Sequence, residues 1–147
     1  MVENLLNKFY TYHFFICLVL QLTAAISASP GKISKGLDIP TMAKYMDAIH
    51  LMAYDLHGSW ERTADHHSPL YARPWDANAD EQLNADFSIK HLMKLGAPAS
   101  KLVLGIPTYG RSFSVQVNSD MKPPLPANGG GAAGSITKQS GYLGYFF

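Results

Sequence analysis

Cysteine is almost absent from this 147-residue sequence, in which Cys17 stands alone. A single cysteine excludes a disulfide within the chain and says nothing about the redox compartment. The six histidines also lack the spacing of a zinc site, because His66 and His67 are adjacent and the others have no regularly spaced partner. The sequence therefore predicts neither a metal ion nor any other cofactor.

An excess of charge of one sign is also missing, since 12 basic residues stand against 11 acidic ones. A nucleic-acid-binding surface needs a basic stripe that neutralises phosphates, and no such stripe is visible. Hydrophobic residues, in contrast, make up 47% of the chain and aromatic residues 12%, which is enough to fill a core at this length. The composition is typical of a globular domain and argues against nucleic acid as a partner.

The sequence lacks an uninterrupted apolar run that could cross a membrane. Residues 9–26 are rich in apolar side chains, but Tyr12, His13 and Gln21 interrupt them, so a membrane span is not expected. The short apolar run 14–20, followed by small residues, fits a signal peptide, whereas 18–26 also fits a buried strand of a parallel sheet. Local composition leaves both interpretations open.

The next segments predict a short helix and a strand. After a turn signal at 29–31, Pro40 suits the first turn of a helix near 40–47. Residues 49–54 (IHLMAY) then alternate as in a strand, with Ile49, Leu51 and Ala53 on one side.

A polar stretch from 59 to 82 follows and is predicted to be a long loop. Loops of this length are usually functional or disordered. The stretch contains Trp60 and Trp75, and the sequence does not indicate a function for Trp75. His57, His66 and His67 are interpreted as loop histidines.

The second half of the chain predicts one more helix and one more strand. Asn84 is expected to cap a helix that buries Phe87, Ile89, Leu92 and Met93 and ends before Gly96. Residues 101–107 (KLVLGIP) fit a strand that is buried on both faces. Residues 121–134 are rich in proline, glycine and alanine and are expected to form a loop or a domain boundary. Strands that alternate with short crossover helices predict an α/β fold with parallel strands.

Several segments together resemble one known family. Residues 52–61 (MAYDLHGSWE) closely resemble the end of the sixth barrel strand of the family 18 glycoside hydrolases, which are chitinases and chitinase-like proteins. Residues 96–113 (GAPASKLVLGIPTYGRSF) resemble the seventh strand of that family, and 22–28 (LTAAISA) resemble the fifth. Residues 66–71 and 83–86 follow the order and spacing of the same family.

The resemblance, which covers about residues 22–146, implies a partial TIM (β/α)8 barrel. Residues 22–120 would form strands five to seven, and 121–147 would begin a small α+β insertion domain. A complete barrel needs roughly 250 residues, so this chain cannot close one. Because an interior strand is not expected to be a cleaved signal, residues 1–21 remain either a signal-like segment or intron sequence read through in a gene model.

The resemblance also implies a reaction for the whole protein. Family 18 enzymes hydrolyse β-1,4-linked N-acetylglucosamine polymers with retention, using one protein acid and the substrate's own N-acetyl oxygen as nucleophile. The acid is a glutamate that ends a D-x-x-D-x-D-x-E motif. Glu3, Glu61 and Glu81 are the only glutamates here, and none follows that motif. The chain is therefore expected to carry the wall of the sugar-binding cleft without the catalytic acid.

By resemblance, seven residues would contact sugar: Ala25, Met52, Tyr54, Asp55, Trp60, Tyr109 and Arg111. Tyr54 would hold the N-acetyl group, and Asp55 would orient sugar hydroxyls and pair with Arg111. Tyr109, Met52 and the small Ala25 would line the innermost subsite, while Trp60 would stack on a neighbouring sugar.

Each of these residues also has a structural alternative. Tyr54 and Met52 fit a strand tyrosine and a core gap-filler, Arg111 fits a structural ion pair, and Trp60 fits a cap outside the barrel. The pattern of Tyr-Asp after one strand and Tyr-x-Arg after the next favours sugar binding.

The expected partners are chitin or N-acetylglucosamine oligosaccharides, with no role for nucleic acid or membrane and an open oligomeric state. The resemblance implies an extracellular protein. Two alternatives remain: a chitinase-like lectin that binds without cleaving, and a small secreted structural protein that reuses the fragment.

Overall fold

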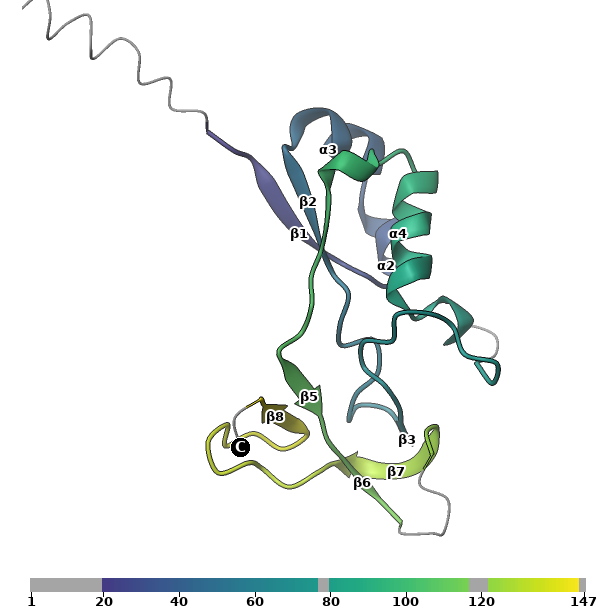
Figure 1. Cartoon of the computed structure of the whole chain (residues 1–147), viewed down its shortest axis with the longest axis vertical. Coiled ribbons are helices and arrows are strands. Elements are labelled where there is room, and N and C mark those ends of the chain that lie inside the picture. Colours follow the sequence, from purple (N-terminus) through teal and green to yellow (C-terminus); the bar gives the residue numbers. More distant parts are fainter. Residues whose placement is uncertain (1–19, 77–79, 117–121, 146–147) are drawn as a thin grey trace, which may run out of the picture.

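A computed structural model of the chain describes residues 20–76, 80–116 and 122–145 (Figure 1). A three-stranded parallel sheet runs in the order β1 (Thr23–Ser27), β2 (Ala48–Met52), β4 (Leu102–Leu104). The connections contain α2 (Pro30–Gly36), α3 (Ile39–Tyr45) and α4 (Ala85–Lys94), which cover one face of the sheet. The predicted α/β fold with parallel strands is confirmed, and the described residues do not close a barrel.

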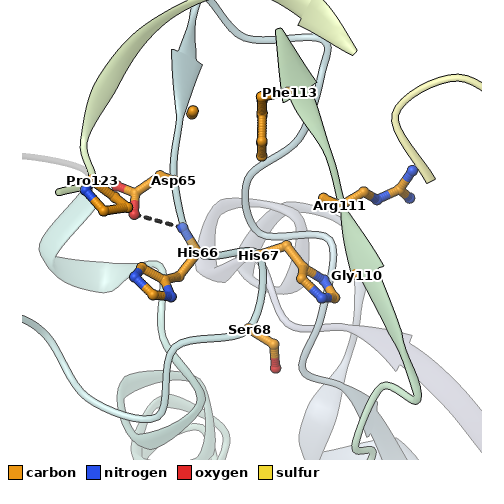
Figure 2. A pocket seen from close by; sticks show the side chains of 9 residues that line it. Asp65, His66, His67, Ser68, Gly110, Arg111, Phe113 and Pro123 are labelled. Atoms are coloured by element: carbon orange, nitrogen blue, oxygen red, sulfur yellow. Dashed lines mark hydrogen bonds between the residues drawn. The ribbon is translucent and has the colours of Figure 1, made fainter. Parts of the chain in front are cut away.

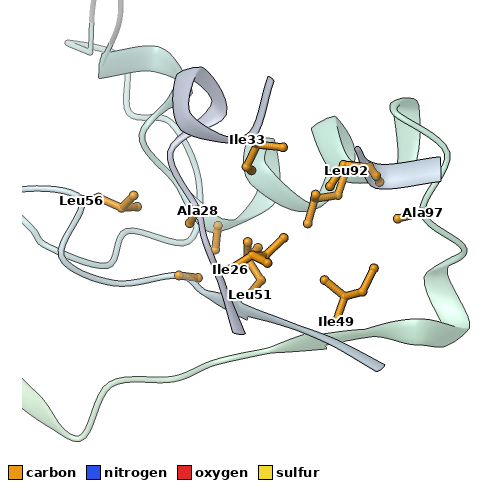
Figure 3. Close-up of a cluster of buried hydrophobic side chains, with 11 residues drawn as sticks. Ile26, Ala28, Ile33, Ile49, Leu51, Leu56, Leu92 and Ala97 are labelled. Carbon is orange, nitrogen blue, oxygen red and sulfur yellow. The ribbon is translucent and has the colours of Figure 1, made fainter. Parts of the chain in front are cut away.

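The core lies between this face and the helices (Figure 3). Ile49 and Leu51 of β2 are fully buried, and the register places Ala24 and Ile26 of β1 beside them. Burying one such large aliphatic side chain contributes about 1.5–3 kcal/mol. The predicted alternation along β2 is therefore confirmed, with one face of the strand in the core.

Helix α4 begins as the sequence predicts. The Oδ1 atom of Asn84 accepts a hydrogen bond of 2.8 Å from the backbone N–H of Phe87, and Nδ2 donates to the carbonyl of Glu81 at 2.9 Å. The predicted buried stripe is partly wrong, because the helix packs through Ala85, Ser88 and Leu92. Met93 lies about 100° around the helix from Leu92 and is 47% exposed.

Three other predictions are wrong. Residues 29–31 do not form a turn, because Pro30 occupies the first turn of α2. The strand predicted at 101–107 is not buried on both faces: β4 covers Leu102–Leu104, and Val103 and Leu104 are 43% and 40% exposed. The cause is its edge position, since β2 is its only partner among the strands that the structure describes.

The third error concerns residues 121–134, which contain strand β7 (Leu125–Gly130) instead of being only a loop. This strand pairs antiparallel with β3 (Thr63–Ala64) and β6 (Phe113–Val115). Pairing with distant segments, not local hydrophobicity, makes it a strand. A further antiparallel pair joins β5 (Tyr109–Arg111) to β8 (Tyr142–Gly144).

These short strands gather beyond the carboxyl ends of β2 and β4 (Figure 1). Two 3₁₀ turns, Asp80–Gln82 and Ala99–Lys101, lie on either side of α4 in the chain. Polar segments at the carboxyl ends of parallel strands are where α/β folds place their binding sites.

The prediction of a parallel strand within residues 18–26 is confirmed. The prediction that this strand is buried is not, because β1 is shorter and lies at an edge of the sheet. The signal-like run 14–20 lies, except for its last residue, outside the described residues. None of the helices in the described part of the chain is long and apolar enough to span a bilayer.

The packing of α4 generates a stability prediction with an internal control. Leu92→Ala should lower the free energy of unfolding by about 2–5 kcal/mol, because it opens a cavity in the core. Met93→Ala, the neighbouring change on the exposed side, should alter it by less than about 0.5 kcal/mol. Urea midpoints of the two variants test this, and equal losses would contradict the described packing.

Candidate functional site

The candidate site lies where strands β2 and β4 end. Tyr54 and Asp55 follow β2 after one intervening residue, and Tyr109 and Arg111 lie on β5, the next strand after β4. Because β2 and β4 are parallel neighbours, their carboxyl ends meet at one edge of the sheet. The four side chains are therefore brought together, although 54 residues separate Asp55 from Tyr109.

The carboxylate of Asp55 is the centre of this cluster. Its Oδ1 accepts hydrogen bonds from the hydroxyl of Tyr109 at 2.6 Å and from Nε of Arg111 at 2.8 Å. Its Oδ2 lies 2.8 Å from Nη2 of Arg111. The predicted pair of Asp55 and Arg111 is thus present, in the two-point geometry that makes arginine–carboxylate pairs strong and directional.

The electrostatics of the cluster keep Asp55 ionised and Tyr109 neutral. Burial alone would raise the pKa of Asp55, but hydrogen bonds from Arg111 and Tyr109 and the charge of Arg111 lower it below its usual value. Burial and the hydrogen bond to Asp55 raise the pKa of Tyr109 far above the ordinary phenol value. The hydrogen bond to Asp55 likewise raises the pKa of Arg111. At neutral pH the site holds one fixed anion and one fixed cation.

Aromatic rings surround the guanidinium of Arg111. Its Cζ lies 5.3 Å from the ring of Trp60 and 5.6 Å from the rings of both Tyr109 and Tyr142. Cation–π attraction at these distances adds to the ion pair. Trp60 itself remains 59% exposed, so one face of its ring is accessible. A Cβ on Gly58 would come within 2.2 Å of that ring, so this position has no room for a larger residue unless the ring moves.

Tyr54 has an unused hydroxyl. Its half-buried ring meets Tyr109 edge-on, with centroids 6.0 Å apart and planes at 75°. Among the described residues no group forms a hydrogen bond with its hydroxyl, which makes Tyr54 a donor available to a ligand.

Ala25 and Met52 lie on the sheet face opposite the core. Ala25 pairs with His50, and Met52 pairs with Ser27, so both residues alternate with the buried side chains of their strands. Continued alternation brings Tyr54 to the same face. The structure thus brings five of the predicted residues into contact, namely Tyr54, Asp55, Trp60, Tyr109 and Arg111. Ala25 and Met52 lie on the sheet face that leads to Tyr54.

Sequence reasoning missed two members of the site. Tyr142 stacks on Tyr109 with centroids 4.8 Å apart, and it arrives through the pairing of β8 with β5. His67 contacts both Asp55 and Tyr109 through its ring nitrogens. No local pattern marks either residue, although His67 belongs to a segment that follows the family order.

A cavity of about 370 Å³ lies beside His67 (Figure 2). His66, Phe113 and Pro123 contribute to its wall, and Arg111 contributes from β5. Figure 2 shows the side chain of Arg111 extending away from His66, toward the opposite side of β5. The cavity therefore backs onto the Asp55 cluster instead of containing it.

The stretch predicted to be one long loop, 59–82, contains β3 and a 3₁₀ turn at Asp80–Gln82, and residues 77–79 lie outside the described ones. An ion-pair cluster holds its first part, residues 59–76, together. Arg73 contacts Asp65 and Asp76, with Nη2 at 2.8 Å from Asp65 Oδ2 and 2.7 Å from Asp76 Oδ1. The ring of Trp75, to which the sequence assigned no role, lies 5.7 Å from this guanidinium. In the described ranges no three His, Cys, Asp or Glu side chains are grouped as metal ligands.

Comparisons with known proteins show which family the chain is similar to. A family model described as glycosyl hydrolases family 18 matches residues 18–146. Chitotriosidase-1 of Mus musculus is 44% identical over 127 residues, which are 86% of this chain and 27% of the relative. Probable chitinase 2 of Drosophila melanogaster is 41% identical over 126 residues, which are 86% of this chain and 25% of the relative. The chain thus spans about a quarter of these two curated relatives.

Solved structures give the same result. An immunomodulatory active chitinase of Trichuris suis superposes with a TM-score of 0.83 at 36% identity, covering 86% of this chain and 34% of that one. Human YKL-39, a pseudo-chitinase with retained chitooligosaccharide binding properties, superposes with a TM-score of 0.84 at 36% identity. That match covers 92% of this chain and 38% of the pseudo-chitinase.

The lowered pKa of Asp55 predicts how stability depends on pH. An acid whose pKa is lower in the folded chain stabilises the fold above its unfolded-state pKa of about 3.9, and this stabilisation is lost as the pH falls through the folded-state pKa. Asp55→Asn should therefore lower the free energy of unfolding at neutral pH. It should also reduce the decrease of this free energy as the pH falls. Urea midpoints between roughly pH 2 and pH 7 measure this. Asp86→Asn, which removes an exposed ion pair with Lys90, is the control. It should leave the decrease of stability at acidic pH unchanged.

Proposed function

The chain belongs to glycosyl hydrolase family 18, and from this membership we propose that it carries one wall of the sugar-binding cleft of a chitinase-like protein. The ligand is a β-1,4-linked N-acetylglucosamine polymer or oligosaccharide. One observation carries the proposal: the hydroxyl of Tyr54, which has no hydrogen-bond partner among the described residues, stands beside the Asp55–Tyr109–Arg111 cluster, and the exposed Trp60 lies next to Arg111.

The whole protein is a (β/α)8 barrel in this proposal. Strands β1, β2 and β4 are its strands five, six and seven, and the segment from about residue 121 begins an α+β insertion domain. The parallel order of the three strands supports this assignment. So do the TM-scores of 0.83 and 0.84 with the active chitinase and the pseudo-chitinase.

The cleft would bind sugar through complementary polar groups. The hydroxyl of Tyr54 donates a hydrogen bond to the acetamide of the substrate. This acetamide is the internal nucleophile of the reaction class. Asp55 remains anionic, and among the described residues its Oδ2 contacts only Arg111, so lone-pair capacity is left for a sugar hydroxyl. Charge-assisted hydrogen bonds of this kind orient a ligand strongly.

The remaining predicted residues shape the subsites. Met52 and the small Ala25 lie on the open face of the sheet and would provide an apolar floor for the sugar. Trp60 offers an exposed ring face, on which the apolar CH face of a pyranose stacks. Arg111 holds Trp60 and Tyr109 in a fixed relation through cation–π contacts.

Two functions use the same cleft. In the first, the whole protein is an extracellular chitinase whose acid lies on a part of the barrel that this chain does not carry. In the second, it is a lectin that binds oligosaccharide without cleavage. The pseudo-chitinase among the structural neighbours, which retains chitooligosaccharide binding, supports the second as a real alternative. A D-x-x-D-x-D-x-E motif in the complete coding sequence would decide for the enzyme.

Binding without turnover is the first test. The chain should bind N-acetylchitotetraose but release no product from it, because no residue here can protonate the leaving oxygen. Tyr54→Phe should weaken binding about three- to tenfold, as expected for one lost hydrogen bond. Tyr45→Phe, at an exposed tyrosine of α3, is the control and should bind like wild type. Isothermal titration with chitotetraose, and with cellotetraose to test the acetamide, measures both effects. Equal affinity for the two sugars would refute the proposal.

The position of Trp60 predicts a dependence on ligand length. Stacking at the rim is worth about 0.5–1.5 kcal/mol, so Trp60→Ala should weaken binding of a chitohexaose up to about tenfold. A chitobiose that does not reach the ring should lose little. Trp75→Ala removes the other exposed tryptophan and should leave both affinities unchanged. An equal loss for both sugars would show that Trp60 acts by supporting Arg111 instead.

A further inference from the structure

The backbone at Asp55 adopts an uncommon conformation. Its φ angle is +55°, in the left-handed region that residues with a Cβ rarely occupy. The turn lies two residues after the buried Ala53, and it places the carboxylate against Tyr109 and Arg111 of β5. Surrounding contacts must hold such a turn in place.

The contacts that hold the turn come from His67 and its neighbour. The backbone N–H of Asp55 donates to Nδ1 of His67 at 3.3 Å, and the N–H of Leu56 donates to the carbonyl of His67 at 2.9 Å. The hydroxyl of Ser68 donates to the carbonyl of Ala53 at 2.5 Å. Two consecutive loop residues therefore satisfy the backbone on both sides of Asp55.

The second ring nitrogen of His67 reaches the other strand. Its Nε2 lies 3.1 Å from the carbonyl oxygen of Tyr109, and the two rings pack with centroids 5.0 Å apart. Because Nδ1 faces an N–H donor and Nε2 faces a carbonyl, only one form satisfies both partners. That form is the neutral ring with its proton on Nε2.

We propose that His67 is a positioning residue for the sugar-binding cleft: its neutral ring joins the turn at Asp55 to the strand of Tyr109, and protonation of the ring breaks this link and weakens sugar binding. The effect of His67 on sugar binding rests on the proposed function. The link between the turn at Asp55 and the strand of Tyr109 concerns the chain without sugar.

The surroundings of His67 favour the neutral ring. Burial lowers its pKa, while the hydrogen bond with the Tyr109 carbonyl and the charge of Asp55 raise it, and the charges of Arg111 and His66 lower it. The net result is a pKa below the usual histidine value. A proton on Nδ1 would remove the acceptor of the Asp55 N–H and face the carboxylate Oδ1 at 3.7 Å. It would then compete with Tyr109 and Arg111 for that oxygen.

The sign of the pH effect follows from this shift. A histidine with a lowered folded-state pKa stabilises the fold fully above its unfolded-state value of about 6.5, and this stabilisation declines as the pH falls below that value. Sugar binding should weaken as the pH falls through the folded-state pKa of His67.

Nuclear magnetic resonance of the 147-residue chain, labelled uniformly with ¹⁵N, tests the link directly. The expected result at neutral pH is a protonated Nε2 and an unprotonated Nδ1 on His67. The backbone amide of Asp55 should shift with the same midpoint as the His67 ring during acid titration. A proton on Nδ1 at neutral pH would overturn the proposal without any use of sugar. So would an Asp55 amide whose chemical shift does not change as the His67 ring titrates.

Variants test the consequence for binding. His67→Ala should weaken N-acetylchitotetraose binding about tenfold at neutral pH, because it removes both ring contacts. His67→Gln offers one acceptor and one donor without a titrating group, so it should recover most of the affinity and lose the acid-dependent weakening. His66→Gln, at the adjacent exposed histidine, is the control and should retain that weakening.

The outcomes separate the two proposals. If wild type does not bind chitotetraose, the proposed function fails, while the ring protonation and the Asp55 amide still decide whether His67 holds the turn. If wild type binds but His67→Ala binds equally well, the positioning role of His67 is wrong and the proposed function stands. If His67→Gln keeps the acid-dependent weakening, another group causes it.

Discussion

The carboxylate of Asp55 has to face β5 although it belongs to the end of β2, and the rest of the site depends on this constraint. A continuing strand would carry the side chain away, so the chain enters the left-handed region at this residue. Once turned, one oxygen can accept from both Tyr109 and Arg111. The carboxylate thereby joins the ends of two parallel strands that share only three paired positions in the sheet.

The two faces of this sheet have separate tasks. The face toward the helices packs the fully buried Ile49 and Leu51 into one core with Leu92 of α4, and this apolar burial supplies stability. The opposite face presents Ala25 and Met52 and leads to Tyr54. Strand alternation therefore lets adjacent residues serve different purposes, and a side chain on the open face can change without directly disturbing the core.

How far the sequence predicts this structure depends on the range of the interactions. The alternation of β2 and the cap at Asn84 are local features, and the structure confirms both. The strand β7 and the stacking of Tyr142 on Tyr109 depend on pairing between distant segments, which composition does not reveal. The pair of Asp55 and Arg111 was nevertheless predicted, because the family resemblance carried long-range information that the local pattern lacks. His67 was missed because a histidine in a polar loop gives no sign of its partners.

The edge strands indicate what the cleft requires from the rest of the protein. Val103 and Leu104 of β4 are partly exposed, and Ile106, just beyond the strand, is 78% exposed. Apolar side chains on an open edge of a parallel sheet favour association with other chains. Association pairs the free backbone groups of the edge and buries its apolar surface. In a complete barrel, neighbouring strands would cover these edges, and the chain matches only about a quarter of its curated relatives. The contacts of Asp55 with Tyr109, Arg111 and His67, in contrast, lie within the described residues. The geometry of this cluster is therefore set by contacts between the β2 and β5 regions of the chain itself, while the exposed edges of the sheet leave its apolar surface uncovered.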